Sequence, residues 1–325
     1  MPLLRFIVKS LGRLIGCCVF GLCGLFAACS RDDPALWKRV NGQWTYDGNM
    51  FEAADPGSLK ALDGRFARDA VRGYYRGLRV PDSHGPSFEV LGEHEARDHQ
   101  AVYWADTYRD GQSYYMIRRI RLHVIEGADP ARYQVLKYGY GRDSHLAFFE
   151  GRALKGILDP ASFEVLTPRL ARDARRAYFE DQAIEGSDGA SFQIIDVHDD
   201  AWVRDRQHAW HVRVVLPGSD AGPRREVRLL DRALVESLKP LGRGYASDGR
   251  RVWWRGQWLK DADAATFTVL EESPASAAAS SGAASSGAAS GAALEPVTQP
   301  APPGDARDAR GTFDNGRRMA AAAKR

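Results

Sequence analysis

Cysteine is nearly absent from this chain of 325 residues, and its four copies, Cys17, Cys18, Cys23 and Cys29, all lie within the first 29 positions. The rest of the sequence can therefore form no disulfide and no cysteine-based metal site, and its folded part must rely on its own core. A charge excess is missing too. Residues 1–28 carry three basic and no acidic side chains, which leaves 42 of each sign in the remainder. Nucleic-acid-binding surfaces need an excess of Lys and Arg, so we expect no nucleic-acid partner.

Motifs for catalysis are also lacking. The sequence has no Gly-x-Ser-x-Gly elbow, no His-Glu-x-x-His and no glycine-rich phosphate loop. His208 and His211, with Asp205 nearby, could begin a metal site on a helix, but residues three apart on a strand face opposite sides. We therefore expect no catalytic residue, no metal site and no cofactor. A carboxylate pair for glycoside hydrolysis has no local signature, so a hydrolase stays an alternative.

The N-terminus has the pattern of an export signal. Arg5, Lys9 and Arg13 precede an uncharged stretch over residues 14–28, a basic region followed by a short apolar one. These 15 residues would span about 22 Å as a helix, less than the roughly 30 Å hydrocarbon layer of a bilayer. A permanent membrane helix is the less favoured alternative: Pro2–Val8 is also apolar apart from Arg5, but Lys9 and Arg13 interrupt that extension.

The segment Phe26-Ala27-Ala28-Cys29 resembles the bacterial lipobox, in which small residues precede a cysteine that receives diacylglycerol. The resemblance implies a lipoprotein signal peptide over residues 1–28 and lipid attachment at Cys29, with a membrane anchor made by the acyl groups. Phe26 stands where Leu is usual. Cys17 is the competing attachment site, and ordinary secretion with an incidental cysteine is the other alternative. Ser30 after the cysteine, in place of Asp, implies an outer-membrane lipoprotein.

A repeated pattern fills the middle of the chain: an aspartate is followed five and six positions later by a pair of aromatic residues or, in one copy, by an aromatic residue and a histidine. The six copies are Asp69 with Tyr74-Tyr75, Asp98 with Tyr103-Trp104, Asp143 with Phe148-Phe149, Asp173 with Tyr178-Phe179, Asp205 with Trp210-His211, and Asp248 with Trp253-Trp254. The aspartates are 29, 45, 30, 32 and 43 residues apart. The period is therefore about 30 residues, with insertions around Thr107–His123 and Val212–Val227. A partial copy over residues 46–59 precedes the array.

Each unit holds short β-prone runs separated by Asp, Gly and Pro, a pattern typical of strands and turns. The aspartate closes a turn by accepting backbone N–H groups. A Gly or Asp two positions after the aromatic pair predicts a hairpin turn at Gly77, Asp106, Gly151, Asp181 and Gly256. Adjacent strand residues point to opposite faces, so one aromatic can enter the core of its unit while the other covers the next unit. Helix is expected to be minor, at Asp231–Leu238 and at Asp-Pro turns.

The recurring aspartate and twin aromatics resemble the DKNYY family of bacterial repeat proteins over about residues 44–272. The resemblance implies a repeat fold and a cell-envelope location, without an assigned reaction. We expect a mainly β array of about 30-residue repeats of short antiparallel strands and hairpins, open because propeller blades usually need about 40 residues. Residues 29–43 are expected to be a linker. Residues 273–325, rich in Ala, Ser, Gly and Pro at their start, are expected to be a disordered tail.

These observations favour a non-enzymatic, membrane-anchored envelope lipoprotein facing the periplasm or the surface, which binds an envelope protein or a glycan along its repeat surface. Tyr and Trp are frequent in recognition surfaces, so Tyr75, Trp104, Trp210 and Trp254 are the candidate contact residues. The arginine before most of the aspartates is expected to lie in a solvated charged row. A carbohydrate- or peptidoglycan-active hydrolase and a structural spacer are the alternatives.

Overall fold

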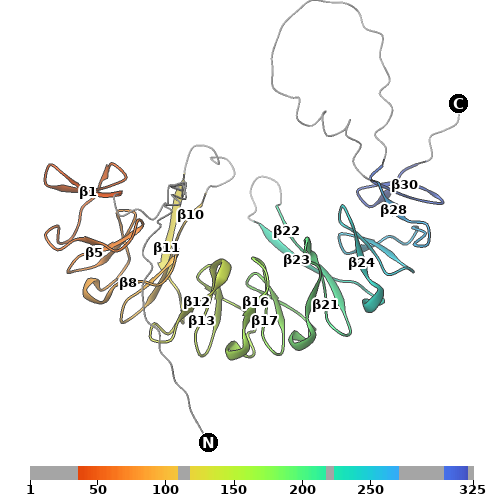
Figure 1. The fold of residues 1–325 in the computed structure, drawn as a ribbon, viewed down its shortest axis with the longest axis horizontal. Helices are drawn as coiled ribbons and strands as arrows, with labels where there is room; N and C mark the ends of the chain where they lie inside the picture. Colours follow the sequence, from red (N-terminus) through yellow and green to blue (C-terminus); the bar gives the residue numbers. More distant parts are fainter. Residues whose placement is uncertain (1–35, 109–117, 217–222, 271–303, 321–325) are drawn as a thin grey trace, which may run out of the picture.

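A computed structural model describes residues 36–108, 118–216, 223–270 and 304–320 of the chain. These residues form eight small antiparallel sheets, which follow one another in sequence order along an open arc (Figure 1). The first sheet and the last lie at opposite ends of the arc, so the array does not close into a ring. The expected mainly β repeat fold is confirmed, and so is the open arrangement.

Most sheets are four-stranded meanders in which consecutive strands pair, and sheet 1 has three strands. The strands of sheets 1 to 4 are β1 (Trp37–Val40), β2 (Gln43–Tyr46) and β3 (Asn49–Met50); β4 (Lys60–Ala61), β5 (Phe66–Arg68), β6 (Gly73–Tyr75) and β7 (Leu78–Arg79); β8 (Glu89–Val90), β9 (Glu95–Arg97), β10 (Val102–Tyr108) and β11 (Arg119–Val124); and β12 (Gln134–Val135), β13 (Tyr140–Arg142), β14 (Ala147–Phe149) and β15 (Arg152–Ala153).

The strands of sheets 5 to 8 are β16 (Glu164–Val165), β17 (Leu170–Arg172), β18 (Ala177–Phe179) and β19 (Gln182–Ile184); β20 (Gln193–Asp196), β21 (Asp199–Arg204), β22 (Ala209–Val215) and β23 (Arg224–Leu229); β24 (Lys239–Gly242), β25 (Tyr245–Ser247), β26 (Val252–Trp254) and β27 (Gln257–Trp258); and β28 (Thr268–Val269), β29 (Ala306–Asp308), β30 (Gly311–Asp314) and β31 (Arg317–Arg318). Short 3-10 turns precede the first strand of several sheets and lie on the outer edge of the arc: η2 (Gly85–Ser87), η4 (Pro160–Ser162), η5 (Gly189–Ser191) and η6 (Val235–Ser237).

The core is divided into seven clusters of buried side chains, one at each junction between neighbouring sheets. The aromatic pair explains how one strand serves two of them. In sheet 5, Tyr178 packs in the cluster shared with sheet 4, and Phe179 packs in the cluster shared with sheet 6. Phe163, from the segment before β16, lies between Tyr140 and Tyr178, with ring centroids 5.9 Å from each. The predicted division of the two aromatics between neighbouring units is therefore confirmed.

The repeated aspartate joins two turns that are distant in sequence. In sheet 5, Oδ1 of Asp173 accepts the backbone N–H groups of Arg175 and Arg176, each at 2.7 Å, which closes the turn between β17 and β18. Its Oδ2 accepts the Tyr178 hydroxyl at 2.7 Å and the N–H of Asp159, before η4, at 3.1 Å. The same bond from a preceding turn to Oδ2 recurs at the other repeat aspartates. A buried carboxylate that accepts at least three hydrogen bonds thus holds two turns of each unit together, and a tyrosine hydroxyl adds a further donor where the first aromatic residue is Tyr.

The arginine before the aspartate makes the complementary bond to the following unit. Nη1 of Arg142 donates to the carbonyl oxygen of Ala161 at 2.8 Å, and Nη1 of Arg172 donates to that of Phe192 at 3.0 Å. Arg68, Arg97 and Arg204 bond to backbone carbonyls of the next unit in the same way. The prediction of solvated charge rows is wrong, because these guanidinium groups satisfy carbonyls at the next turn.

Several predicted boundaries are also wrong. Residues 304–320 were expected to be disordered, but β29 pairs with β28, β30 with β29 and β31 with β30, which completes sheet 8. Arg307-Asp308 followed by Phe313 repeats the aspartate–aromatic spacing, and Asp308 accepts the N–H of Asp263 at 2.8 Å. The linker expected over residues 29–43 already contains β1. Asp106 lies inside β10 because the insertion lengthens that hairpin, and Asp231–Leu238 contains only the short η6.

Within the described residues, no helix is long and apolar enough to cross a bilayer. The predicted signal peptide, with Cys29 and Cys17, lies outside the residues that the structure describes.

Candidate functional site: two pockets of opposite charge

Two sheets differ from the others because their last two strands are long. The hairpin β10–β11 belongs to sheet 3 and the hairpin β22–β23 belongs to sheet 6. Both extend beyond the inner, concave edge of the arc. The strand ends farthest from the arc lean toward each other over sheets 4 and 5 (Figure 1). These are the two predicted insertions. They break the regular outline of the array, and each is bordered by a pocket.

The pocket beside the first hairpin, here called the acidic pocket, has a volume of about 440 Å³. Its lining includes the carboxyl groups of Glu93, Glu95, Asp106 and Glu150 together with Trp104 and Tyr138. Arg121 on β11 binds two of these carboxylates: it pairs with Asp106 across the hairpin and reaches Glu150 of sheet 4 at 3.0 Å. The hairpin is thereby tied to the sheet that follows it.

Glu95 occupies a position that is apolar elsewhere in the array. Three residues before the repeat aspartate, sheets 2, 4, 5, 6 and 7 have Phe66, Tyr140, Leu170, Trp202 and Tyr245, all buried. The terminal sheet 8 has the less buried Asp305 at this place. Glu95 is 2% exposed, and burial, with a smaller contribution from Glu93, raises its pKa to about 7. Burying an ionisable carboxyl group in a core position lowers the stability of the fold when the group is charged, so its presence there indicates a role other than packing.

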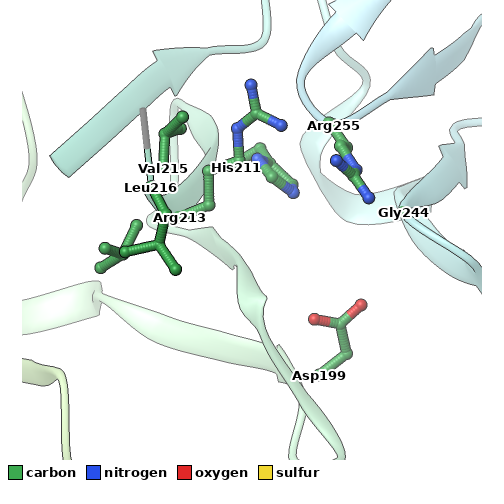
Figure 2. A pocket seen from close by; sticks show the side chains of 8 residues that line it. Asp199, His211, Arg213, Val215, Leu216, Gly244 and Arg255 are labelled. Atoms are coloured by element: carbon green, nitrogen blue, oxygen red, sulfur yellow. The ribbon is translucent and has the colours of Figure 1, made fainter. Parts of the chain in front are cut away.

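The pocket beside the second hairpin, here called the basic pocket, has a volume of about 520 Å³. Figure 2 shows the guanidinium groups of Arg213 and Arg255 and the imidazole of His211 on one side, with Asp199 apart from them. Glu226 on β23 binds Nη2 of Arg213 at 2.6 Å and Nη2 of Arg228 at 2.5 Å. One carboxylate therefore serves two arginines.

His211 takes the place of the second aromatic residue in sheet 6. It is 4% exposed and packs edge-on against Trp202, with ring centroids 4.6 Å apart. Burial first, and then the neighbouring Arg213, Arg228 and Arg255, lower its pKa to about 4. The imidazole is therefore neutral near pH 7. Its Nδ1 atom is buried without a hydrogen-bond partner among the described residues.

The two pockets lie at equivalent places of the repeat with reversed charges. Eight residues after the aspartate stands Asp106 in sheet 3 and Arg213 in sheet 6, and their cross-strand partners are Arg121 and Glu226. The hairpin turn of the following sheet supplies Glu150 to the acidic pocket. The corresponding turn supplies Arg255 to the basic one. A common scaffold thus presents an acidic pocket and a basic pocket on the inner edge of one arc.

The candidate contact residues lie elsewhere than expected. Tyr75, Trp104 and Trp210 are at most 2% exposed, so they do not form a contact surface, because the repeat uses its twin aromatics to fill the junctions between sheets. Trp104 still lines the acidic pocket. Trp254 is half-buried beneath Arg255, whose guanidinium carbon lies 4.7 Å from the centre of the Trp254 ring.

Sequence reasoning missed both pockets. A comparison of the residue three places before each aspartate would have found Glu95, and a comparison of the residue seven places after it would have found Glu150 and Arg255. Where a metal is concerned, the described residues contain no group of three His, Cys, Asp or Glu side chains arranged to bind one. His208 and His211 do not come together with Asp205 in such a group.

An open array of small sheets, each sharing its core with its neighbours, defines a β-repeat protein whose stability comes from nearest-neighbour junctions. The model of the DKNYY family matches residues 37–182 and 159–282, which together cover most of the chain. The chain therefore belongs to the DKNYY family. No curated protein and no solved structure matches it.

Proposed function

We propose that this chain is a non-enzymatic, membrane-anchored envelope lipoprotein that binds a partner along the inner edge of its arc. The observation that carries the proposal is the pair of long hairpins that lean over that edge, one bordered by an acidic pocket and the other by a basic pocket. Extended concave faces are the usual recognition surfaces of repeat proteins. The lipobox-like segment ending at Cys29 supports the anchor and the envelope location.

Ion pairs from the hairpins to the middle of the arc support a preformed surface. Arg225 on β23 binds Glu180 at 2.7 Å and Asp181 at 2.9 Å, both in the hairpin turn of sheet 5. Arg121 binds Glu150 of sheet 4 from the other side. Each hairpin is thus held over a neighbouring sheet before any partner arrives, which lowers the ordering cost of binding.

Photo-crosslinking in the intact envelope tests the proposal. A photoreactive residue is placed on the hairpins at Tyr108 and Leu216, which are 44% and 80% exposed, and on the outer-edge turns at His145 and Arg175 as matched controls. We expect the two hairpin positions to capture the same partner and the two control positions to capture none. Equal capture from both edges would contradict a binding surface on the inner edge. No capture from the hairpins would contradict the proposal and favour a structural spacer.

The predicted anchor has a separate test. Mass spectrometry of the mature N-terminus is expected to find a chain that begins at Cys29 and carries a diacylglyceryl group. A chain that begins at Cys17, or one with a free thiol at its N-terminus, would refute that assignment.

Glu95 favours a second candidate function, a carbohydrate- or peptidoglycan-active hydrolase. A buried carboxyl group with a pKa of about 7 can hold a proton for a leaving group, and the pocket around it also has other carboxylates and Trp104. Purified full-length protein is incubated with peptidoglycan, and released fragments are measured by mass spectrometry. Fragment release that disappears in Glu95→Gln would support the hydrolase; no release from the unaltered protein would remove it.

A further inference from the structure

The basic pocket has an unbalanced set of cationic groups. Glu226 is shared by Arg213 and Arg228. Arg255 stacks on Trp254 and, among the described residues, has no carboxylate within ion-pair distance. Asp199 is the other acidic residue of the pocket and lies apart from these guanidinium groups, so that three arginines stand against two carboxyl groups (Figure 2). The pocket therefore keeps an excess of positive charge at neutral pH.

A second observation points to a ligand in the same cavity. His211 lines the pocket from β22, is almost wholly buried, and has an Nδ1 atom without a partner among the described residues. A buried polar atom without a hydrogen-bond partner is destabilising, so a ligand atom that reaches Nδ1 would remove that penalty.

The equivalent place in sheet 3 shows how the repeat balances its charges when no anion is needed. There Arg121 bridges Asp106 and Glu150, so the turn residue of the next sheet is paired. In sheet 6 the reversed charges would require a carboxylate that bridges Arg213 and Arg255. Glu226 is bonded to Arg213 and Arg228 instead, and Arg213 and Arg255 both line the pocket (Figure 2).

We propose that the basic pocket is a binding site for a carboxylate or phosphate group, held between the guanidinium groups of Arg213 and Arg255 with a further bond to Nδ1 of His211. This inference deepens the proposed function, on which it rests, by stating the chemistry of the group that the partner presents to the second hairpin. Guanidinium groups bind both anions through paired N–H donors, and a neutral imidazole protonated on Nδ1 supplies one more.

Isothermal titration of the full-length protein with inorganic phosphate, and separately with succinate at equal ionic strength, tests the site. We expect saturable binding of at least one of the two, and the comparison tells which anion the pocket prefers. Arg255→Gln is expected to weaken binding by at least about tenfold, since a bond between charged groups is worth about 1.5–3 kcal/mol.

Arg76→Gln is the matched control. Arg76 occupies the same turn position in sheet 2 and lies over the ring of Tyr75, at 5.7 Å, as Arg255 lies over Trp254, but it does not line the basic pocket. Its replacement is expected to leave anion binding unchanged. The proposal is overturned if neither anion binds saturably, or if the two variants lose binding equally.

The outcomes separate this inference from the proposed function. Hairpin crosslinks that persist while neither anion binds would refute the anion site alone. Saturable anion binding without any crosslinked partner would refute the proposed function and leave the site as a pocket for a free anion.

Discussion

Glu95 gives the sharpest stability prediction. Replacing it with Leu, the residue at the same place in sheet 5, should make the protein more stable at neutral pH. Burial raises the pKa of the carboxyl group from 4.5 to about 7. At about 1.4 kcal/mol per pKa unit, this shift corresponds to about 3 kcal/mol of stability that is absent at high pH.

The sign follows from the raised pKa. Below pH 4.5 the carboxyl group is protonated in both the folded and the unfolded chain, so its burial causes no pH-dependent loss. As the pH rises toward 7, the unfolded chain ionises first and folding becomes less favourable. The stability of the variants Glu95→Leu and Glu95→Gln, relative to that of the unaltered protein, should therefore rise by about 2–3 kcal/mol between pH 4.5 and pH 8.

Urea unfolding, followed by the fluorescence of the tryptophans at pH 4.5 and pH 8, measures this gain. Glu95→Gln is the matched control for shape, because it removes the titration and keeps the size of the side chain. A gain that is equal at both pH values would show that packing and not ionisation is responsible. If the variants are less stable than the unaltered protein at pH 8, the assignment of Glu95 as a buried acid with a raised pKa is refuted.

Three further predictions concern the array. In urea unfolding, Asp173→Asn should lower the stability of the protein by about 2–4 kcal/mol, because the asparagine turns an amide group toward buried donors. Tyr178→Phe removes a single hydrogen bond and should cost only about 1 kcal/mol. Equal losses in the two variants would contradict the role of the carboxylate. The unaltered protein should lose up to about 3 kcal/mol of stability as the pH falls from 6.5 to 4, since His211 is protonated there only in the unfolded chain. His211→Phe should abolish this loss. An unchanged pH profile of unfolding in the variant would refute the buried neutral imidazole. Phe313→Ala should speed hydrogen exchange in sheet 8 and leave sheets 4 and 5 unaffected, because each sheet depends on its neighbours; acceleration throughout would show a single cooperative core.

Much of the fold could be predicted from the spacing between the aspartates and the aromatic pairs. That spacing identified six of the eight sheets, and the alternation of a strand explains why Tyr178 and Phe179 fill different junctions. Sheet 8 was not predicted because residues 271–303 separate Asp263 from Asp308, and because its unit has only Phe313 in place of an aromatic pair. Its signal was the Asn315-Gly316 turn, in which both residues have positive φ.

The candidate site could not be predicted from motifs. Its residues come from different sheets: Arg213 lies on a long hairpin and Arg255 in the turn of the next sheet, so only the stacking of the sheets brings them together. The twin aromatics looked like a contact surface because Tyr and Trp are frequent at interfaces. In a repeat of about 30 residues the same side chains are needed to build the core.

The central claim is that one aspartate bond joins the turns along the array through to sheet 8. Residue-resolved amide hydrogen exchange tests it most directly. The amide of Asp263, which donates to Asp308 from 45 positions away, should exchange as slowly as the amide of Asp159, which donates to Asp173 within sheet 5. Exchange of Asp263 and of β30 at the rate of an unstructured chain would contradict the account.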